Sequence, residues 1–115
     1  MLRFWHNPRC SKSREAAALL AARGVKADVV EYLAQPPTAA EVETLLRKLG
    51  GDPRALVRFK ESEAAALGLA ATDERTTAEW AAVLSAHPRL IERPVLETRD
   101  RAVIGRPAER FDELL

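Results

Sequence analysis

Apolar runs and helix-forming stretches alternate in the first third of the chain, in the order that a βαβ unit requires. The run Leu2–Trp5 is apolar and ends in a polar loop, which predicts a strand. Ser11–Arg23 consists of good helix formers, with Ser11 as the predicted cap and Gly24 as the predicted C-terminal glycine. Val25–Leu33 is rich in β-preferring residues and predicts a second strand. Crossovers of this size are right-handed in nearly all sheets, so we expect the two strands to be parallel.

The middle of the chain has the pattern of a helical block. Thr38 and Glu41 form a capping box, which opens a helix whose apolar positions recur every three or four residues up to Leu49. A pair of glycines ends this helix, and either Thr76 or Thr77 is expected to cap a later one. After the helix that ends at Leu49, the predicted helices are Pro53–Arg58, Glu61–Leu67 and Thr76–His87.

The last third of the chain has a hairpin pattern. Two short apolar runs, Pro94–Glu97 and Ala102–Ile104, flank a polar turn and predict antiparallel strands. Pro107 begins a final helix that carries Phe111. The element order indicates an α/β domain with a mixed sheet of about four strands. We interpret residues 1–115 as a single domain, with a helical insertion at about 38–88 between the βαβ unit and a C-terminal ββα unit.

Composition and charge narrow the function classes. Hydrophobic residues make up 47% and charged residues 30% of the 115 residues, which is typical of a globular protein and excludes a largely disordered one. Lys and Arg number 18 and Asp and Glu 17, so the formal charge of +1 gives no general attraction to nucleic acid. No apolar run approaches the roughly 20 residues that span a bilayer, and no signal peptide is visible. We therefore expect a cytoplasmic protein with no nucleic acid or membrane partner.

The single cysteine, Cys10, is the first candidate for chemistry. One cysteine excludes an internal disulfide and any metal site built on several thiolates. Cys10 lies where the first strand ends and the first helix begins, a place that favours an anion such as a thiolate. His6, Arg9 and Lys12 are close in sequence, and cationic neighbours lower a cysteine pKa. The alternative interpretation is a small, buried core residue.

Two polar residues near Cys10 have two interpretations each. His6 could act as a base or as a charged neighbour of the thiol, or it could be a surface group or a residue that hydrogen-bonds within the turn. Ser13 lies three residues after Cys10, where its hydroxyl could donate to a thiolate or serve as an ordinary capping group. His87, before a proline at the end of a predicted helix, is assigned no chemistry.

Two arginines occupy matching positions at the ends of the hairpin. Arg93 precedes Pro94 and Arg106 precedes Pro107, and proline disfavours helix at the residue before it. The two guanidinium groups are therefore expected to converge at one end of the sheet. Their planar donors suit a tetrahedral oxyanion, since each can bind two oxygens at once. An oxyanion beside a thiolate would make a coherent site.

These residues, together with several short motifs, resemble one family. The motifs are His6-Asn7-Pro8-Arg9-Cys10-Ser11-Lys12-Ser13-Arg14, Tyr32-Leu33 before Pro36-Pro37-Thr38, Arg54-Ala55-Leu56-Val57-Arg58, His87-Pro88, Glu92-Arg93-Pro94 and Gly105-Arg106-Pro107. In this order they resemble the ArsC-type, glutaredoxin-dependent arsenate reductase family, and they span essentially the whole chain. The resemblance implies a thioredoxin/glutaredoxin-like fold with a helical insertion.

The resemblance also implies a mechanism and a set of site residues. Cys10 corresponds to the thiolate that attacks arsenate, and His6 and Ser13 match positions that tune it. Glutathione then attacks the thiol–arsenate adduct, and glutaredoxin resolves the mixed species as arsenite leaves. Glutathione is the reductant, and no tightly bound cofactor or metal is expected. The oxyanion-binding residues implied by the resemblance are Arg58, Arg93 and Arg106.

Two alternatives stay open at this point. Ser11 and Lys12 stand where many family members have Gly-Thr, and the added charge bears on the choice of anion or partner. One alternative is a Spx-like transcription regulator that binds RNA polymerase, although such proteins usually have cysteine at the position of Ser13 and lack the pair Arg106-Pro107. The other is a glutathione-dependent thiol reductase with a different substrate, such as a glutathione mixed disulfide.

Overall fold

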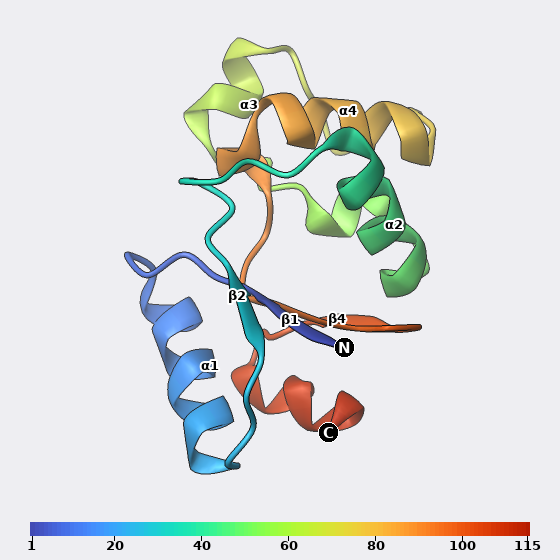
Figure 1. Ribbon diagram of the computed structural model, residues 1–115. Helices are drawn as coiled ribbons and strands as arrows, with labels where there is room; N and C mark the ends of the chain where they lie inside the picture. The colour runs from blue at the N-terminus through green and yellow to red at the C-terminus, as the bar shows by residue number, and fades with distance from the viewer. The chain divides into compact units, whose positions relative to one another are not determined.

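The computed structural model describes residues 1–115, which divide into two compact units. The first unit comprises residues 1–35 and 93–115, and the second comprises residues 36–92. Figure 1 shows the sheet in the first unit and a group of helices in the second. None of the helices has the length and apolar character needed to cross a membrane. That the two units fold as one domain stays a prediction.

The first unit is built on a four-stranded mixed sheet. Its strands are β1 (Leu2–Trp5), β2 (Asp28–Val30), β3 (Val95–Thr98) and β4 (Ala102–Ile104), in the order β2-β1-β3-β4. Strands β1 and β2 are parallel, as their connection through a helix predicts, whereas β1 with β3 and β3 with β4 are antiparallel. The predicted fold class, with its βαβ unit and C-terminal ββα unit, is confirmed.

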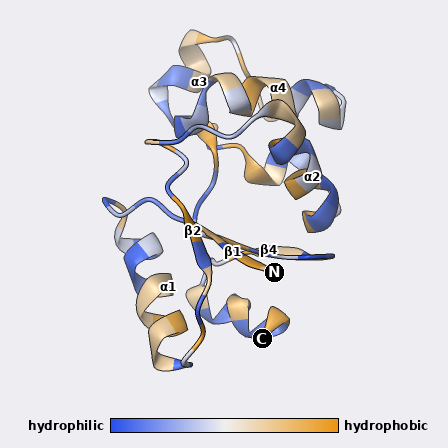
Figure 2. Cartoon of the chain, viewed as in Figure 1, coloured by the Kyte–Doolittle hydropathy of each residue, from blue (hydrophilic) through white to orange (hydrophobic).

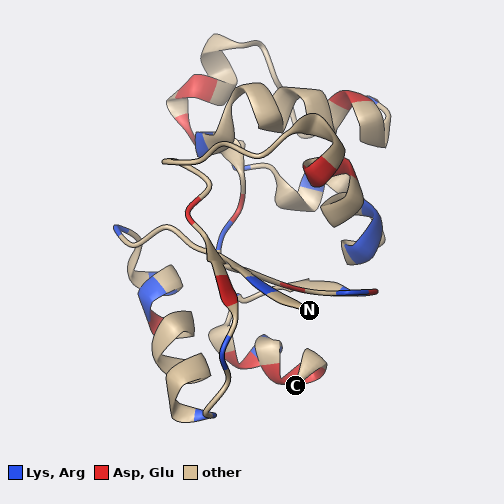
Figure 3. Ribbon diagram, in the orientation of Figure 1, with Lys and Arg blue, Asp and Glu red and all other residues tan.

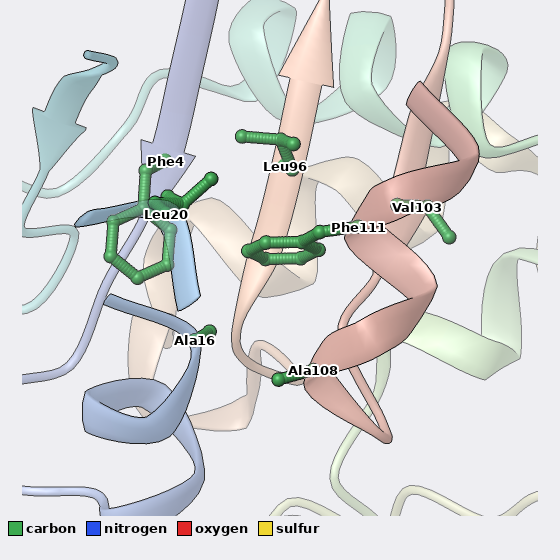
Figure 4. Packing of buried hydrophobic residues seen from close by; sticks show 7 residues of the cluster. All are labelled: Phe4, Ala16, Leu20, Leu96, Val103, Ala108 and Phe111. Carbon is green, nitrogen blue, oxygen red and sulfur yellow. The ribbon is translucent and has the colours of Figure 1, made fainter. Parts of the chain in front are cut away.

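One face of this sheet carries the core of the first unit. Phe4, Leu96 and Val103 are aligned across β1, β3 and β4, and all three are buried. Helix α1 (Ser11–Ala22) and the 3-10 helix η3 (Ala108–Leu114) cover this face, as Figures 1 and 4 show. The ring of Phe111 meets the ring of Phe4 edge to face, with centroids 5.9 Å apart. Aromatic pairs favour this arrangement, so it orients η3 on the sheet.

A glycine makes the close approach of Phe111 possible. A Cβ atom on Gly105 would lie 2.6 Å from Cε1 of Phe111, which is well inside van der Waals contact. Any side chain at Gly105 would therefore displace the ring. Gly105 is followed directly by Arg106, so the packing of η3 fixes the backbone just before this arginine.

Three details near α1 differ from the prediction. The N-cap is Cys10 and not Ser11, because the first helical bond runs from Arg14 N–H to Cys10 O at 3.0 Å. Strand β2 is shorter than the predicted Val25–Leu33 because local turns occupy the backbone on both sides of it. Before it, Val25 N–H binds Leu20 O at the end of α1. After it, residues 34 and 35 donate to the carbonyl oxygen of residue 31.

The C-terminal segment is also shorter and tighter than predicted. The helix begins at Ala108 and not at Pro107, whose backbone is extended, and it is a 3-10 helix. Its bonds join residues three apart, as from Arg110 N–H to Pro107 O at 3.0 Å.

The second unit is a small helical assembly. Helices α2 (Ala39–Leu49) and α4 (Thr77–Ala86) pack against each other, and Trp80 and Leu45 are completely buried. Figure 2 shows α4 as apolar along most of its length, whereas in α2 apolar residues alternate with hydrophilic ones. The predicted capping box on Thr38 is present. Of the two caps considered for the later helix, Thr76 is the one observed, and it too forms a capping box. The remaining elements are η1 (Pro53–Leu56), α3 (Ser62–Ala66) and η2 (Pro88–Leu90).

The predicted helix Pro53–Arg58 is thus wrong in type and length. It is a 3-10 turn that ends at Leu56, because Val57 turns extended and forms a β-bridge with Ile91. Bonds from Arg58 N–H to Leu90 O and from residue 92 to Leu56 O extend this bridge on both sides. Arg58 is therefore held by a backbone hydrogen bond directly after this bridge.

Candidate functional site

A tight turn places Cys10 at the start of α1. Cys10 N–H donates to Asn7 O at 3.0 Å, and Arg9 N–H donates to the side-chain oxygen of Asn7 at the same distance. Asparagine often organises a turn through such local bonds. The turn from residue 7 to residue 10 therefore fixes the backbone of Cys10, whose side chain is partly exposed.

The surroundings of the Cys10 sulfur favour the thiolate. Burial alone would raise the pKa of Cys10. The backbone N–H groups of Ser13 and Lys12, together with the charge and a hydrogen bond of the Arg93 guanidinium, outweigh burial and lower the pKa overall. The side chain of Cys10 makes no capping hydrogen bond, so these free N–H donors at the helix start remain for the anionic sulfur. Because the thiolate is the nucleophilic form of cysteine, the prediction of an activated thiol has a structural basis.

The cation responsible is not one that the sequence suggested. The ammonium of Lys12 lies 3.8 Å from the carboxylate of Glu15, and it is the backbone of Lys12 that acts on the sulfur. The side chains of Arg9 and His6 do not contribute to the lowered pKa of Cys10. Arg93, 83 positions along the chain from Cys10, supplies the charge instead. Figure 3 shows basic residues in the loop before α1 and in its first turn.

Ser13 connects His6 to the turn. Its side chain is completely buried, and its hydroxyl oxygen accepts a hydrogen bond from Asn7 N–H at 3.0 Å. The same oxygen lies 2.6 Å from His6 Nδ1. A neutral imidazole with its proton on Nε2 gives the hydroxyl proton an acceptor at Nδ1. Ser13 therefore ties the His6 ring and the backbone of the turn to the first turn of α1.

The environment of His6 favours this neutral form. Burial lowers the pKa of His6, the nearby carboxylate of Glu31 raises it, and the charge of Arg14 lowers it, with a lowered pKa as the net result. The imidazole stacks on the ring of Phe4, with centroids 4.7 Å apart. His6 is therefore a fixed neutral group at the edge of the core, joined to the turn through Ser13.

Arg93 and Arg106 lie at the two ends of the hairpin and are joined through the backbone of Arg93; that their guanidinium groups converge on an anion stays a prediction. Nε of Arg106 donates to Arg93 O at 2.8 Å, and Gly105 N–H donates to Pro94 O, also at 2.8 Å. Both Arg–Pro peptide bonds are cis. The Arg93 guanidinium also lowers the pKa of Cys10, so the first unit brings the thiol close to the start of β3, and Arg106 is tied to the same place.

Arg58 belongs to the second unit, where its guanidinium group has two partners. Its Nη2 lies 2.7 Å from Glu61 Oε1, and its Nη1 donates to the carbonyl oxygen of Arg89 at 3.2 Å. Both members of the pair with Glu61 are only 22% exposed. The role of Arg58 as an anion ligand stays a prediction.

Sequence reasoning missed two acidic residues. Glu97 is 2% exposed, and its carboxylate accepts a hydrogen bond from Trp5 Nε1 at 3.0 Å, although 92 residues separate the two. Glu31 is exposed and acts on the pKa of His6. Neither stands in a motif, so no local signal could have identified them. The structure contains no group of three or more His, Cys, Asp or Glu residues that could hold a metal ion.

Comparison with known proteins gives a consistent result. The model of the ArsC family matches residues 5–114. An arsenate reductase of Neisseria meningitidis is 39% identical over 115 residues, which cover 99% of this chain and 97% of the relative. An arsenate reductase of Haemophilus influenzae is also 39% identical, covering 97% of each chain. The solved structure of an arsenate reductase from Vibrio cholerae superposes with a TM-score of 0.91 at 36% identity, covering 99% of this chain and 97% of that one. These likenesses confirm the predicted thioredoxin-like fold class.

Proposed function

The chain belongs to the ArsC family, whose model matches nearly all of it, and on this basis we propose that it reduces arsenate to arsenite through a covalent adduct on Cys10. The observation that carries the proposal is the Cys10 sulfur at the start of α1, where Arg93 and two backbone N–H groups favour its thiolate. Relatives that are 39% identical over nearly their full length are named arsenate reductases.

Arsenate is a tetrahedral oxyanion, and the site has donors that suit it. Arg93 and Arg106 are joined at the hairpin ends, and each guanidinium can bind two oxygens. In this proposal the two arginines hold the anion against the Cys10 sulfur. Arg58 is the third anion ligand that the family resemblance implies. Its guanidinium would exchange the carboxylate of Glu61 for an arsenate oxygen.

The first chemical step forms the adduct. The Cys10 thiolate attacks arsenic, a sulfur–arsenic bond forms, and one arsenate oxygen leaves as water after it takes up protons. Arsenic is still As(V) at this stage. The donors around the anion stabilise the negative charge that gathers on its oxygens during the attack.

External thiols then supply the two electrons, because the chain has no second cysteine. A glutathione thiol displaces another oxygen as water, so that arsenic is bound to both sulfurs. A glutaredoxin thiolate attacks the glutathione sulfur, a disulfide forms, and the electron pair of the broken sulfur–arsenic bond reduces As(V) to As(III). Water releases arsenite and returns the Cys10 thiol. These reductants belong to a reducing compartment, so we place the reaction in the cytoplasm.

His6 and Ser13 act in this scheme through position. Ser13 holds the Asn7 backbone and faces His6 Nδ1, and its own backbone N–H acts on the Cys10 sulfur. His6 and Ser13 are therefore positioning residues, which hold the turn against the first turn of α1. Their loss is expected to change the reactivity of the thiol more than the affinity for arsenate.

A coupled assay tests the proposal. The protein is mixed with arsenate, glutathione, glutaredoxin, glutathione reductase and NADPH, and NADPH oxidation is followed. Wild type and the matched control Ser11→Ala should give arsenate-dependent oxidation, and Cys10→Ser should give none while keeping its circular dichroism spectrum. Absence of arsenate-dependent turnover in folded wild-type protein would overturn the proposal.

The two alternatives give different results in parallel experiments. Turnover of a glutathione mixed disulfide without any response to arsenate would indicate a thiol reductase with another substrate. Specific capture of RNA polymerase by the folded protein, with no turnover in either assay, would indicate the Spx-like regulator. Either result contradicts arsenate reduction as the activity of this chain.

A further inference from the structure

A groove lies directly beside the turn that carries Cys10. Its volume is about 390 Å³, within the usual range for small-molecule sites. One wall is the segment His6–Arg9 and the other consists of Glu31, Leu33 and Ala34, all within the first unit. Arg9 is followed immediately by Cys10, so the groove borders the turn at the residue before the cysteine.

The groove carries one charge of each sign. Arg9 and Glu31 are both exposed, and neither side chain takes part in an ion pair or a side-chain hydrogen bond. The only interaction of the Glu31 carboxylate is its effect on the pKa of His6. Figure 3 shows basic residues in the loop before α1 and an acidic residue in the segment after β2. The two walls thus offer a cation and an anion to a ligand.

This charge pattern selects against arsenate and in favour of a zwitterion. The Glu31 carboxylate would repel a second oxyanion, whereas it can pair with an ammonium group while Arg9 pairs with a carboxylate. Leu33 is 40% exposed and adds an apolar surface to the wall that carries Glu31. A short peptide with an amino terminus, free carboxylates and a thiol on a short aliphatic side chain matches all three features.

We propose that this groove binds the peptide thiol that attacks the Cys10 adduct, with glutathione as its simplest occupant. Arg9 pairs with a carboxylate of the peptide, Glu31 pairs with its α-ammonium group, and the thiol points past Arg9 toward Cys10. The inference rests on the proposed function, because it names the residues that receive the reductant. The anion is bound by Arg93 and Arg106, so the two substrates approach the sulfur from different sets of residues.

Binding of S-methylglutathione tests the groove without any turnover. This compound keeps the charges of glutathione but has no free thiol, and its binding is followed by NMR titration of wild-type protein. The largest shifts are expected at the backbone amides of residues 7, 9 and 31–34. Because each exposed pair contributes about 0.2–1 kcal/mol, Arg9→Gln and Glu31→Gln should each weaken binding by up to about fivefold, and the double variant further. The matched controls Lys26→Ala and Glu109→Gln should bind like wild type.

Kinetics provide a second readout. When arsenite formation is measured directly, so that the readout does not depend on glutathione reductase, the ratio of the KM for glutathione to the KM for 2-mercaptoethanol, which has neither charge, should rise in both groove variants. Equal S-methylglutathione affinity in wild type and both variants, or shifts confined to residues outside the groove, would overturn the inference. Failure of the proposed function is distinguishable, since it abolishes turnover in the assay and leaves the binding titration intact.

Discussion

Ser13→Ala should destabilise the protein although it removes a single oxygen. The hydroxyl is completely buried, accepts from Asn7 N–H at 3.0 Å and lies 2.6 Å from His6 Nδ1. Alanine leaves both groups without this partner. An unsatisfied buried polar group costs about 1–3 kcal/mol, and these two are partly buried, so we take about 1 kcal/mol for each. The better helix propensity of alanine returns about 0.5 kcal/mol, which leaves a net loss of about 1.5 kcal/mol.

This loss corresponds to a measurable shift of the melting temperature. An unfolding entropy of about 2.1 cal/mol/K per residue gives about 4 °C per kcal/mol for a chain of this size, so Ser13→Ala should melt about 6 °C below wild type. Ser11→Ala is the matched control, because Ser11 is exposed on the same helical turn. Thermal melts followed by circular dichroism measure both variants. If Ser13→Ala melts within about 2 °C of Ser11→Ala, Ser13 does not hold the turn as the geometry indicates.

Three further predictions concern titration and anion binding. Alkylation of Cys10 by iodoacetamide should have a pH midpoint below the value of about 8.5 for a free thiol, because Arg93 and the helix start lower its pKa; a midpoint at or above that value contradicts the description of the site. Burial lowers the pKa of His6 below its unfolded value of about 6.5, so stability should fall as the pH drops from about 6.5 through the folded pKa, and melts of His6→Gln should lack this part of the slope. Arg58→Lys, Arg93→Lys and Arg106→Lys should each weaken arsenate or sulfate binding about tenfold, because lysine keeps the charge and loses the fork. Competition titration measures the last effect, and unchanged affinity in all three variants would remove the oxyanion site.

Local chemistry explains which parts of the fold could be predicted from the sequence. The capping box at Thr38 joins residues three apart, so its signal is complete within one turn of helix. The parallel pairing of β1 and β2 follows from the handedness of a short crossover. The predicted ends of β2 are wrong although the side chains there favour strands. The backbone on either side of β2 forms its hydrogen bonds with the preceding helix and within the following turn instead of with a neighbouring strand. Propensity describes the side chain, whereas the strand ends where its partners end.

The features of the site also fall into those that the local sequence predicts and those that depend on contacts between distant segments. The position of Cys10 at a helix start follows from the local sequence, and so does the placement of two arginines at the ends of one hairpin. The identity of the cation beside the sulfur does not, because Arg93 reaches Cys10 through the pairing of β1 with β3. Glu97 is hidden from sequence reasoning for the same reason, since its partner Trp5 lies on the opposite strand of that pair.

Cys10 at the N-cap sets a trade-off between stability and reactivity. Serine is among the best N-cap residues, whereas the neutral Cys10 side chain makes no capping bond. Cys10→Ser should therefore stabilise the fold by about 1 kcal/mol, or about 4 °C, wherever the wild-type thiol is neutral. The folded pKa of Cys10 is lowered, so its thiolate contributes stability above the unfolded pKa, and this contribution is lost as the pH falls through the folded pKa. The advantage of serine should hence be largest at about pH 4 and shrink toward about pH 9, and because the two proteins share every other titrating group, the difference between their melting temperatures isolates this thiol. A difference that does not change with pH would mean that the donors at the start of α1 do not act on the thiolate.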